Sequence, residues 1–225
     1  MSLKEFADTL PDYAKDIRLN VGSLLGDQTL TDQRKYGLLL ACAHGTGYKP
    51  IVDAAEAEAA GKLSPEAANA ARASAAVMAM NNVYYRFVHL ASNKDYGQMP
   101  AKLRMNVIGA PGIEKDDFEL FSLAVSAMNG CGMCIDSHEK VLRQHGVGSD
   151  VIQTAARVGA VMKAAATVHA TRRLARQATA NRRLRALFPT ALLRTAQEHL
   201  CRRNLRAYIA LFPGTGLKDL RCSTL

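Results

Sequence analysis

The sequence predicts an all-α protein. Alanine is abundant, aromatic residues make up only 6%, and tryptophan is absent, a composition typical of closely packed helices. Apolar residues recur at helical spacing through most of the chain, and residues that begin or end helices stand between these segments. The alternation of apolar and polar residues that marks a half-buried strand is missing.

The first two segments have clear boundaries. Residues 3–25 read as a helix broken near Pro11, because proline is tolerated only at the start of a helix. Residues 30–45 begin with a cap signal at Thr31 and are expected to end at Gly45.

The middle of the chain contains one long helix and one connection. Ser64 is placed to cap the helix of residues 64–87, and Pro65 occupies its first position. Residues 103–112, "LRMNVIGAPG", are expected to be the main connecting stretch.

Three helices are expected after this connection. Residues 113–130 should stop at Gly130, and residues 131–146 should stop at a second glycine. The next helix should begin with Ser149 or Asp150 as its cap.

An internal repeat is also expected, at an offset of about 85 residues. Gly45 then matches Gly130, and both copies run helix, glycine, short helix and capped helix. At this offset Thr46 and Lys49 stand in the places of Cys131 and Cys134, so the first copy lacks the thiols.

The positive charge is confined to the end of the chain. From Thr171 onward, eleven arginines and one lysine face two acidic residues, whereas the residues before it are nearly neutral. We therefore expect a folded domain at residues 1–170 and an arginine-rich extension at 171–225. Such a tail could bind nucleic acid, but we favour an extension without selected function, for instance an out-of-frame translation. Nucleic-acid binding would be strongly salt-dependent and would disappear on truncation near residue 170.

The five cysteines and the amino terminus indicate a cytoplasmic protein. No apolar run approaches the ~20 residues needed to span a membrane, and charges interrupt the region where a signal peptide would be apolar. An odd number of scattered cysteines does not suit a secreted disulfide framework. In a reducing compartment, a lone C-x-x-C is more often catalytic or metal-binding.

The cysteines of "NGCGMCIDSHEK", residues 129–140, share a helix face with a histidine. At 100° per residue, Cys131, Cys134 and His138 all lie on one side of the helix. Because the helix starts after Gly130, its free N–H groups and dipole favour a thiolate in the first turn. The same spacing lets the two sulfurs reach bonding distance.

His138 can accept a thiol proton or pair with the thiolate, and such a base needs an orienting partner. Glu119, on the preceding helix, is the nearest upstream candidate; Asp136 and Glu139 are closer but are expected to be solvated. A zinc site at Cys131, Cys134 and His138 would lack a fourth ligand in the motif. Cys42, Met78 and Met105 are interpreted as core residues.

These residues resemble the active-site segment of the alkyl hydroperoxidase D (AhpD) family, which carries the pattern E-x11-C-x-x-C-x3-H. The segment "FELFSLAVSAMNGCGMCIDSHEKVLRQHGV" matches it, supported by "LPDYAKDIRLN", "AVMAMNNVYYRF" and "LRMNVIGAPGI". The resemblance covers residues 1 to about 170 and places the chain in the carboxymuconolactone decarboxylase-like superfamily.

The resemblance implies an all-α homotrimer with a duplicated helical core that acts as an antioxidant thiol peroxidase. It implies no bound cofactor: electrons come from dihydrolipoamide on a lipoylated E2 protein of a ketoacid dehydrogenase, and an AhpC-type peroxiredoxin is a second partner. Cys134 would attack the peroxide, Cys131 would donate a proton, resolve the sulfenic acid and exchange disulfides with the partner, and Glu119 and His138 would relay protons. The position of Cys131 at the helix start instead favours it as the thiolate, so the sequence leaves open which thiol ionises.

Two features depart from the family, and one rival enzyme is related to it. Members often carry a histidine where this chain has Met133, and the arginine-rich tail would disturb trimer assembly if it displaces the last helix. A carboxymuconolactone decarboxylase-like enzyme has no use for a dithiol, so lactone turnover after alkylation of both thiols would distinguish the two.

Overall fold

The computed structural model describes residues 1–187, and within this range it contains helices and no strands. The all-α fold class expected from the sequence is therefore confirmed. The chain divides into two units, Met1–Thr171 and Arg172–Leu225, which are described separately. The tail beyond residue 187, with Cys201 and Cys222, lies outside the described residues.

The first helices follow the predicted breaks. Helix α1 (Leu3–Asp8) has a capping box between Ser2 and Glu5, and Pro11 separates it from a short 3-10 turn and from α2 (Lys15–Gly26). Helix α3 (Asp32–Thr46) is capped by Thr31, as expected. It ends one turn position later than predicted, because the left-handed residue is Gly47 (φ 66°) and not Gly45.

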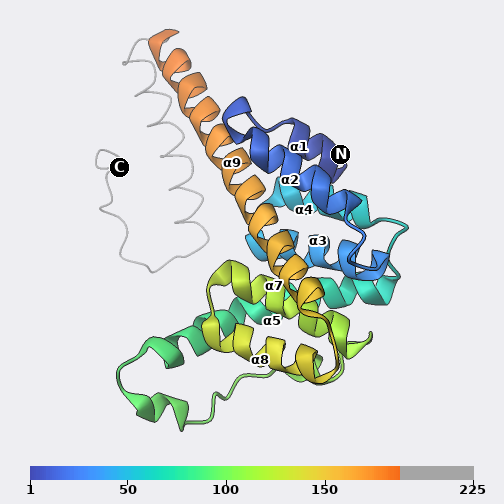
Figure 1. Cartoon of the computed structure of the whole chain (residues 1–225). Helices are drawn as coiled ribbons and strands as arrows, with labels where there is room; N and C mark the ends of the chain where they lie inside the picture. Colours follow the sequence, from blue (N-terminus) through green and yellow to red (C-terminus); the bar gives the residue numbers. More distant parts are fainter. Residues whose placement is uncertain (188–225) are drawn as a thin grey trace, which may run out of the picture. The chain divides into compact units, whose positions relative to one another are not determined.

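The remaining helices are α4 (Lys49–Ala59), α5 (Pro65–Leu90), α6 (Asn106–Gly109), α7 (Lys115–Asn129), α8 (Gly132–Gln144) and α9 (Ser149–Leu187) (Figure 1). Helices α5, α7, α8 and α9 lie where the patterns place them, and two further helices, α4 and α6, complete the described part of the chain. Ser64 caps α5 by accepting a hydrogen bond from the N–H of Ala67. Helix α9 begins at Ser149, at the place where its start was expected. The connecting stretch contains the short helix α6.

Helices α3 and α7 form the centre of the Met1–Thr171 unit. Helix α3 packs against α4, α5 and α7, and α7 packs against α3, α5 and α8. A Cβ atom on Gly37 of α3 would overlap the ring of Phe121 of α7, so the two helices approach closely there. Both helices are buried on most of their faces, as expected for helices in the centre of a core.

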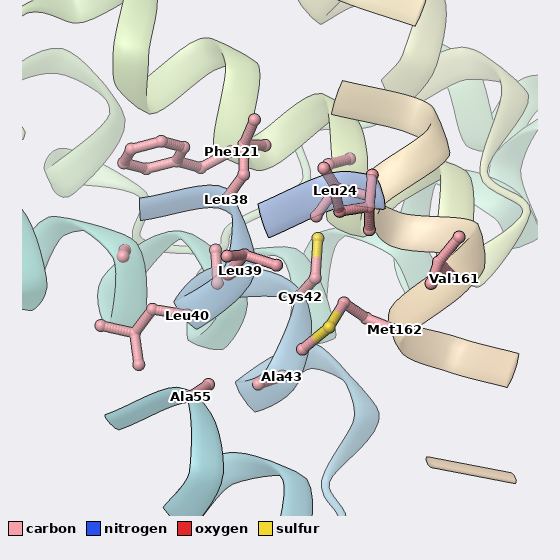
Figure 2. Packing of buried hydrophobic residues seen from close by; sticks show 14 of the residues in the cluster. Leu24, Leu38, Leu39, Leu40, Cys42, Ala43, Ala55, Phe121, Val161 and Met162 are labelled. Atoms are coloured by element: carbon pink, nitrogen blue, oxygen red, sulfur yellow. The ribbon is translucent and has the colours of Figure 1, made fainter. Parts of the chain in front are cut away.

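The core around α3 explains the role of Cys42. Figure 2 shows Cys42 among apolar side chains that include Leu24 and Met162, and its side chain is fully buried. Burial raises the pKa of the Cys42 thiol to about 12, because the thiolate would lose its hydration. The interpretation of Cys42 as a core residue is confirmed.

The helices repeat in order. Helices α3, α4 and α5 are followed along the chain by α7, α8 and α9, and α3 and α7 each have 15 residues. The glycine caps Gly47 and Gly130 both have a positive φ, and the next helices have their N-caps at Tyr48 and Cys131. These positions put the offset at 83 residues for this part of the chain instead of the expected 85.

The corrected offset changes the residues that correspond to the cysteine motif. Tyr48 and Ile51, and not Thr46 and Lys49, take the places of Cys131 and Cys134 in the first copy. Ala55 takes the place of His138. Ile51 and Ala55 are buried in the first copy, as Cys134 and His138 are in the second. The second copy therefore carries its motif residues at positions where the first copy has apolar core residues.

Candidate active site

The turn between α7 and α8 positions the two cysteines. Gly130 adopts the left-handed conformation (φ 67°), and the N–H of Cys131 donates to the carbonyl of Ser126 at 3.1 Å, which closes the end of α7. Cys131 is then the N-cap of α8 and Cys134 lies in its first turn. The free N–H groups at this helix end favour negative charge on either sulfur.

Cys131 and Cys134 are joined by a disulfide. Their Cα atoms are 5.3 Å apart, within the range that a disulfide requires. The two sulfurs differ in accessibility: Cys131 has no exposed surface, whereas Cys134 is 6% exposed and faces a cavity. An incoming reactant can therefore reach Cys134 first.

The cavity beside Cys134 has a volume of about 320 Å³. Its walls come from α5, from the segment around α6, from α7 and from α8, and most of the lining side chains are apolar. The lining residues are Met78, Asn81, Tyr85, Met105, Ile108, Glu119, Met133, Cys134, Ser137, His138 and Val141. A cavity of this size admits a small organic molecule.

Glu119 and His138 form a buried pair in the wall of this cavity. His138 Nδ1–H donates to Glu119 Oε2 at 2.6 Å, and the two side chains are 9% and 4% exposed. The hydrogen bond fixes the orientation of the ring and places a carboxylate where it can stabilise the imidazolium form. Asp136, closer to the cysteines in sequence, is exposed.

The other ring nitrogen of His138 contacts a methionine. Nε2 lies 3.3 Å from Met78 Sδ, and Ser126 Oγ–H also lies 3.4 Å from this sulfur. Ser126 in turn accepts a hydrogen bond from Asn82 Nδ2 at 2.9 Å, and Asn82 Oδ1 accepts one from Asn129 Nδ2 at 2.9 Å. In the disulfide state His138 therefore contacts Glu119 and Met78 through its two nitrogens.

Sequence reasoning missed the part of the site that α5 supplies. Met78 of α5 belongs to the core and Met105, before α6, packs against it, as expected, but both also line the cavity, and Met78 contacts His138. Asn81 also lines the cavity, and Asn82 donates a hydrogen bond to Ser126. Two adjacent asparagines in the apolar stretch "AVMAMNNVYY" are an unusual feature of a buried helix, and this polar pair was the available signal.

The described residues contain neither a metal-binding cluster nor a membrane-spanning helix. Within residues 1–187, no group of three or more His, Cys, Asp or Glu side chains has an arrangement that could hold a metal ion. Over the same part of the chain, no helix has the length and hydropathy needed to span a bilayer.

The chain is similar in sequence to known proteins over about three quarters of its length. A sequence model of the carboxymuconolactone decarboxylase family matches residues 94–177. An alkyl hydroperoxide reductase AhpD of Rhizorhabdus wittichii is 92% identical over 171 residues, which cover 76% of this chain and 99% of that protein. Proteins of the same name from Rhodopseudomonas palustris and Hyphomonas neptunium are 63% and 62% identical, over 74% and 75% of this chain and 92% and 93% of their own.

Proposed function

Because the chain belongs to the AhpD family of carboxymuconolactone decarboxylase-like proteins, we propose that it is an antioxidant enzyme that reduces organic hydroperoxides through Cys131 and Cys134. The relatives are named alkyl hydroperoxide reductases, which supports a peroxide-reducing oxidoreductase. The observation that carries the proposal is the bonded cysteine pair with one sulfur, that of Cys134, at a largely apolar cavity. The cavity suits the organic part of a hydroperoxide ROOH.

The oxidising half of the cycle takes place at Cys134. In the reduced enzyme, His138 takes the proton of Cys134, and Glu119 stabilises the imidazolium. The thiolate attacks the terminal oxygen of ROOH; an S–O bond forms, the O–O bond breaks, and the alcohol ROH leaves with a proton from Cys131. The Cys131 thiolate then attacks the Cys134 sulfenic acid, which gives the disulfide and, with a proton from His138, water.

The reducing half returns two electrons to the disulfide. We propose that a dihydrolipoyl group on an E2 protein supplies them: one thiolate attacks a sulfur of the pair, and the second closes the lipoyl ring and releases both cysteines as thiols. Although the resemblance assigns partner exchange to Cys131, that residue is fully buried in the disulfide state. We therefore place the first attack on Cys134, which a slender dithiol arm can reach through the cavity.

The same dithiol would serve an AhpC-type peroxiredoxin. Reduced Cys131 and Cys134 would pass electrons to the disulfide of that partner, which makes the protein a carrier between lipoyl groups and the peroxiredoxin as well as a peroxidase. This chemistry uses no bound metal, haem or flavin, and a dithiol kept reduced in this way is suited to the cytoplasm.

We propose a homotrimer whose interface includes the end of α5. Val83, Phe87 and Leu90 are 63%, 51% and 71% exposed and recur at helical spacing on one face. Tyr96 packs its ring against Phe87, and Met99 adds a further exposed apolar side chain. Apolar residues exposed together in this way mark association surfaces. Light scattering of the protein in solution should give the mass of three chains, and a monomeric mass would contradict the proposal.

Consumption of an organic hydroperoxide with dihydrolipoamide as donor tests the proposed function. The wild-type protein should consume tert-butyl hydroperoxide, and Cys134→Ser should abolish the activity because the attacking sulfur is lost. Cys42→Ala is the matched control, since it removes a thiol that lies in the core and away from the cavity. An active Cys134→Ser protein would contradict the assignment.

A further inference from the structure

Asn81 is a buried polar residue that the fold does not explain. Its side chain lies in the wall of the cavity that Cys134 faces, and the residue is only 4% exposed. Its Oδ1 atom is buried and has no hydrogen-bond partner. Buried amide oxygens are nearly always paired, because an unpaired one has lost its hydrogen bonds to water without replacement.

The neighbouring residue Asn82 shows what a structural asparagine looks like at this place. Asn82 is 1% exposed, and both ends of its amide are used: Nδ2 donates to Ser126 Oγ, and Oδ1 accepts from Asn129 Nδ2. These bonds join α5 to α7. Because Asn82 already makes this connection, the stability of the helix pair gives no reason for a second asparagine whose oxygen is unpaired.

The position of Asn81 connects it with the reactive sulfur. The Cys134 Sγ atom lies 3.9 Å from the backbone oxygen of Asn81, so the two residues are in contact across α5 and α8. Both side chains line the same cavity. A small molecule that reaches the sulfur therefore also meets the side chain of Asn81, whose amide oxygen lacks a hydrogen-bond donor.

We propose that Asn81 binds the hydroperoxide group of the substrate and orients it toward Cys134. This inference rests on the proposed peroxidase function. The O–H of ROOH donates its hydrogen to Asn81 Oδ1, which places the terminal oxygen beside Sγ. When the thiolate attacks, the hydrogen stays on this oxygen, so the resulting S–OH group keeps the same hydrogen bond while ROH leaves.

The proposal separates the two halves of the catalytic cycle. Asn81 contacts the hydroperoxide and the sulfenic acid, whereas the attack of a dithiol on the disulfide involves no O–H group for Oδ1 to accept. Replacing Asn81 should therefore slow the reaction with hydroperoxide and leave reduction of the disulfide unchanged. Removing an unpaired buried oxygen should also maintain or raise the thermal stability.

Asn81→Leu is the test variant, since leucine has the same branching and number of side-chain heavy atoms and no polar atoms, and Asn81→Ala serves as a second, smaller replacement. For both variants, the reduced protein is mixed with tert-butyl hydroperoxide in a stopped-flow instrument, and the oxidised protein is mixed with dihydrolipoamide. The rate constant with hydroperoxide should fall by about tenfold, the expected effect of losing one hydrogen bond to the reacting group. The rate constant with dihydrolipoamide, the alkylation rate of the thiols by iodoacetamide and the Tm should not fall.

Asn82→Leu is the matched control, because it breaks bonds that join two helices and should lower the Tm. An Asn81→Leu protein that reacts with hydroperoxide at the wild-type rate would overturn the inference. So would equal losses in both half-reactions together with a lower Tm, since that pattern is the signature of a structural residue. If the wild-type protein itself consumes no hydroperoxide, the proposed function fails and this inference fails with it.

Discussion

Glu119 and His138 are two ionisable side chains buried together beside a cysteine pair. Burial of a charge is costly unless a partner and hydrogen bonds compensate, and here the Nδ1–Oε2 hydrogen bond of 2.6 Å provides both. Met78 Sδ occupies the side of the ring that faces away from Glu119. The imidazole can therefore accept a proton at Nε2 without rotating, while the carboxylate hydrogen-bonded to Nδ1 stabilises the positive charge.

Replacing Glu119 should slow the reaction of the reduced enzyme with hydroperoxide. In Glu119→Gln the neutral amide no longer stabilises the imidazolium, so the rate constant should fall by about 10²-fold. Stopped-flow measurement with tert-butyl hydroperoxide gives this rate constant directly. Asp136→Asn is the control, because this carboxylate is exposed on the same helix as His138 and should not matter. Equal rates for wild-type and Glu119→Gln protein would remove the carboxylate from the mechanism.

The motif residues were predictable, and the residues that face them were not. Cys131, Cys134 and His138 lie within eight positions on one helix, so helical geometry alone places them on one face. Met78 and Asn81 approach the motif from about fifty residues away, through the packing of α5 against α8. No periodicity in one segment indicates which residue of another helix it will contact. The deeper burial of Cys131 is also a tertiary effect, because both cysteines look alike in the sequence.

At the scale of secondary-structure elements, the turn at Gly130 determines where α8 begins and therefore where the cysteines lie. Gly130 has a φ of 67°, in a region that residues with a Cβ atom rarely adopt. The space around it is open, because a Cβ atom built there would have no neighbour within 4 Å. The need for glycine is thus a matter of backbone conformation and not of space. The sequence predicted this stop correctly because the glycine ends an otherwise continuous apolar helix.

Gly130→Ala should lower the free energy of unfolding by about 1 kcal/mol, the approximate cost of an alanine in the left-handed region. Chemical denaturation of the reduced protein measures this change. Gly132→Ala is a matched control two residues away: Gly132 is the first residue of α8, has no positive φ, and also has open space around its Cβ position. That variant should be neutral or slightly stabilising. Equal destabilisation by the two substitutions would show that the conformation of the turn is not the cause.

An ion cluster joins three helices of the first repeat. Glu56 of α4 accepts hydrogen bonds from Arg72 of α5 at 2.6 and 2.8 Å and contacts His44 of α3 at 2.8 Å. The Arg72 guanidinium, with a smaller contribution from His44, lowers the pKa of Glu56 to about 2 against the opposing effect of its partial burial. The ionised carboxylate is therefore more stable in the folded protein than in the unfolded chain.

Because the folded pKa of Glu56 is lowered, its contribution to stability is fully present above the unfolded value of 4.5 and disappears as the pH falls toward about 2. Glu56→Gln should therefore lower the Tm at pH 7 and at pH 6, and the difference from wild type should shrink between pH 4.5 and pH 2. Thermal melts across this range test the prediction. Asp53→Asn is the control, since Asp53 forms an exposed pair with Lys49 that contributes little. A Tm difference that does not change with pH would contradict the role of the ionised carboxylate.

At the scale of the whole molecule, the chain combines a family domain with a tail of different composition. The site residues all lie between Met78 and Val141, within the Met1–Thr171 unit. The 171 aligned residues cover 99% of the Rhizorhabdus wittichii relative but only 76% of this chain. About a quarter of this chain therefore has no counterpart in that relative. The composition predicts that an arginine-rich extension begins near residue 171, but it carries no pattern from which a fold or a function could be predicted.

Deletion of the residues after Thr171 should leave the peroxidase activity unchanged, because no residue of the cavity lies in the deleted part. Dihydrolipoamide-supported consumption of tert-butyl hydroperoxide by the full-length and shortened proteins measures this. Binding of DNA, if the full-length protein shows any, should be strongly salt-dependent and absent from the shortened protein. Loss of peroxidase activity on truncation would show that the extension supports the site or its assembly.

The central claim is that Cys134 is the sulfur that reacts with the hydroperoxide, and trapping of its sulfenic acid tests this most directly. Cys131→Ser protein cannot form the disulfide, so one equivalent of tert-butyl hydroperoxide should leave Cys134 as a sulfenic acid that dimedone labels. Mass spectrometry of the digested protein should then find one label, on Cys134. A label on Cys42, or no label on any cysteine while hydroperoxide is consumed, would contradict the account.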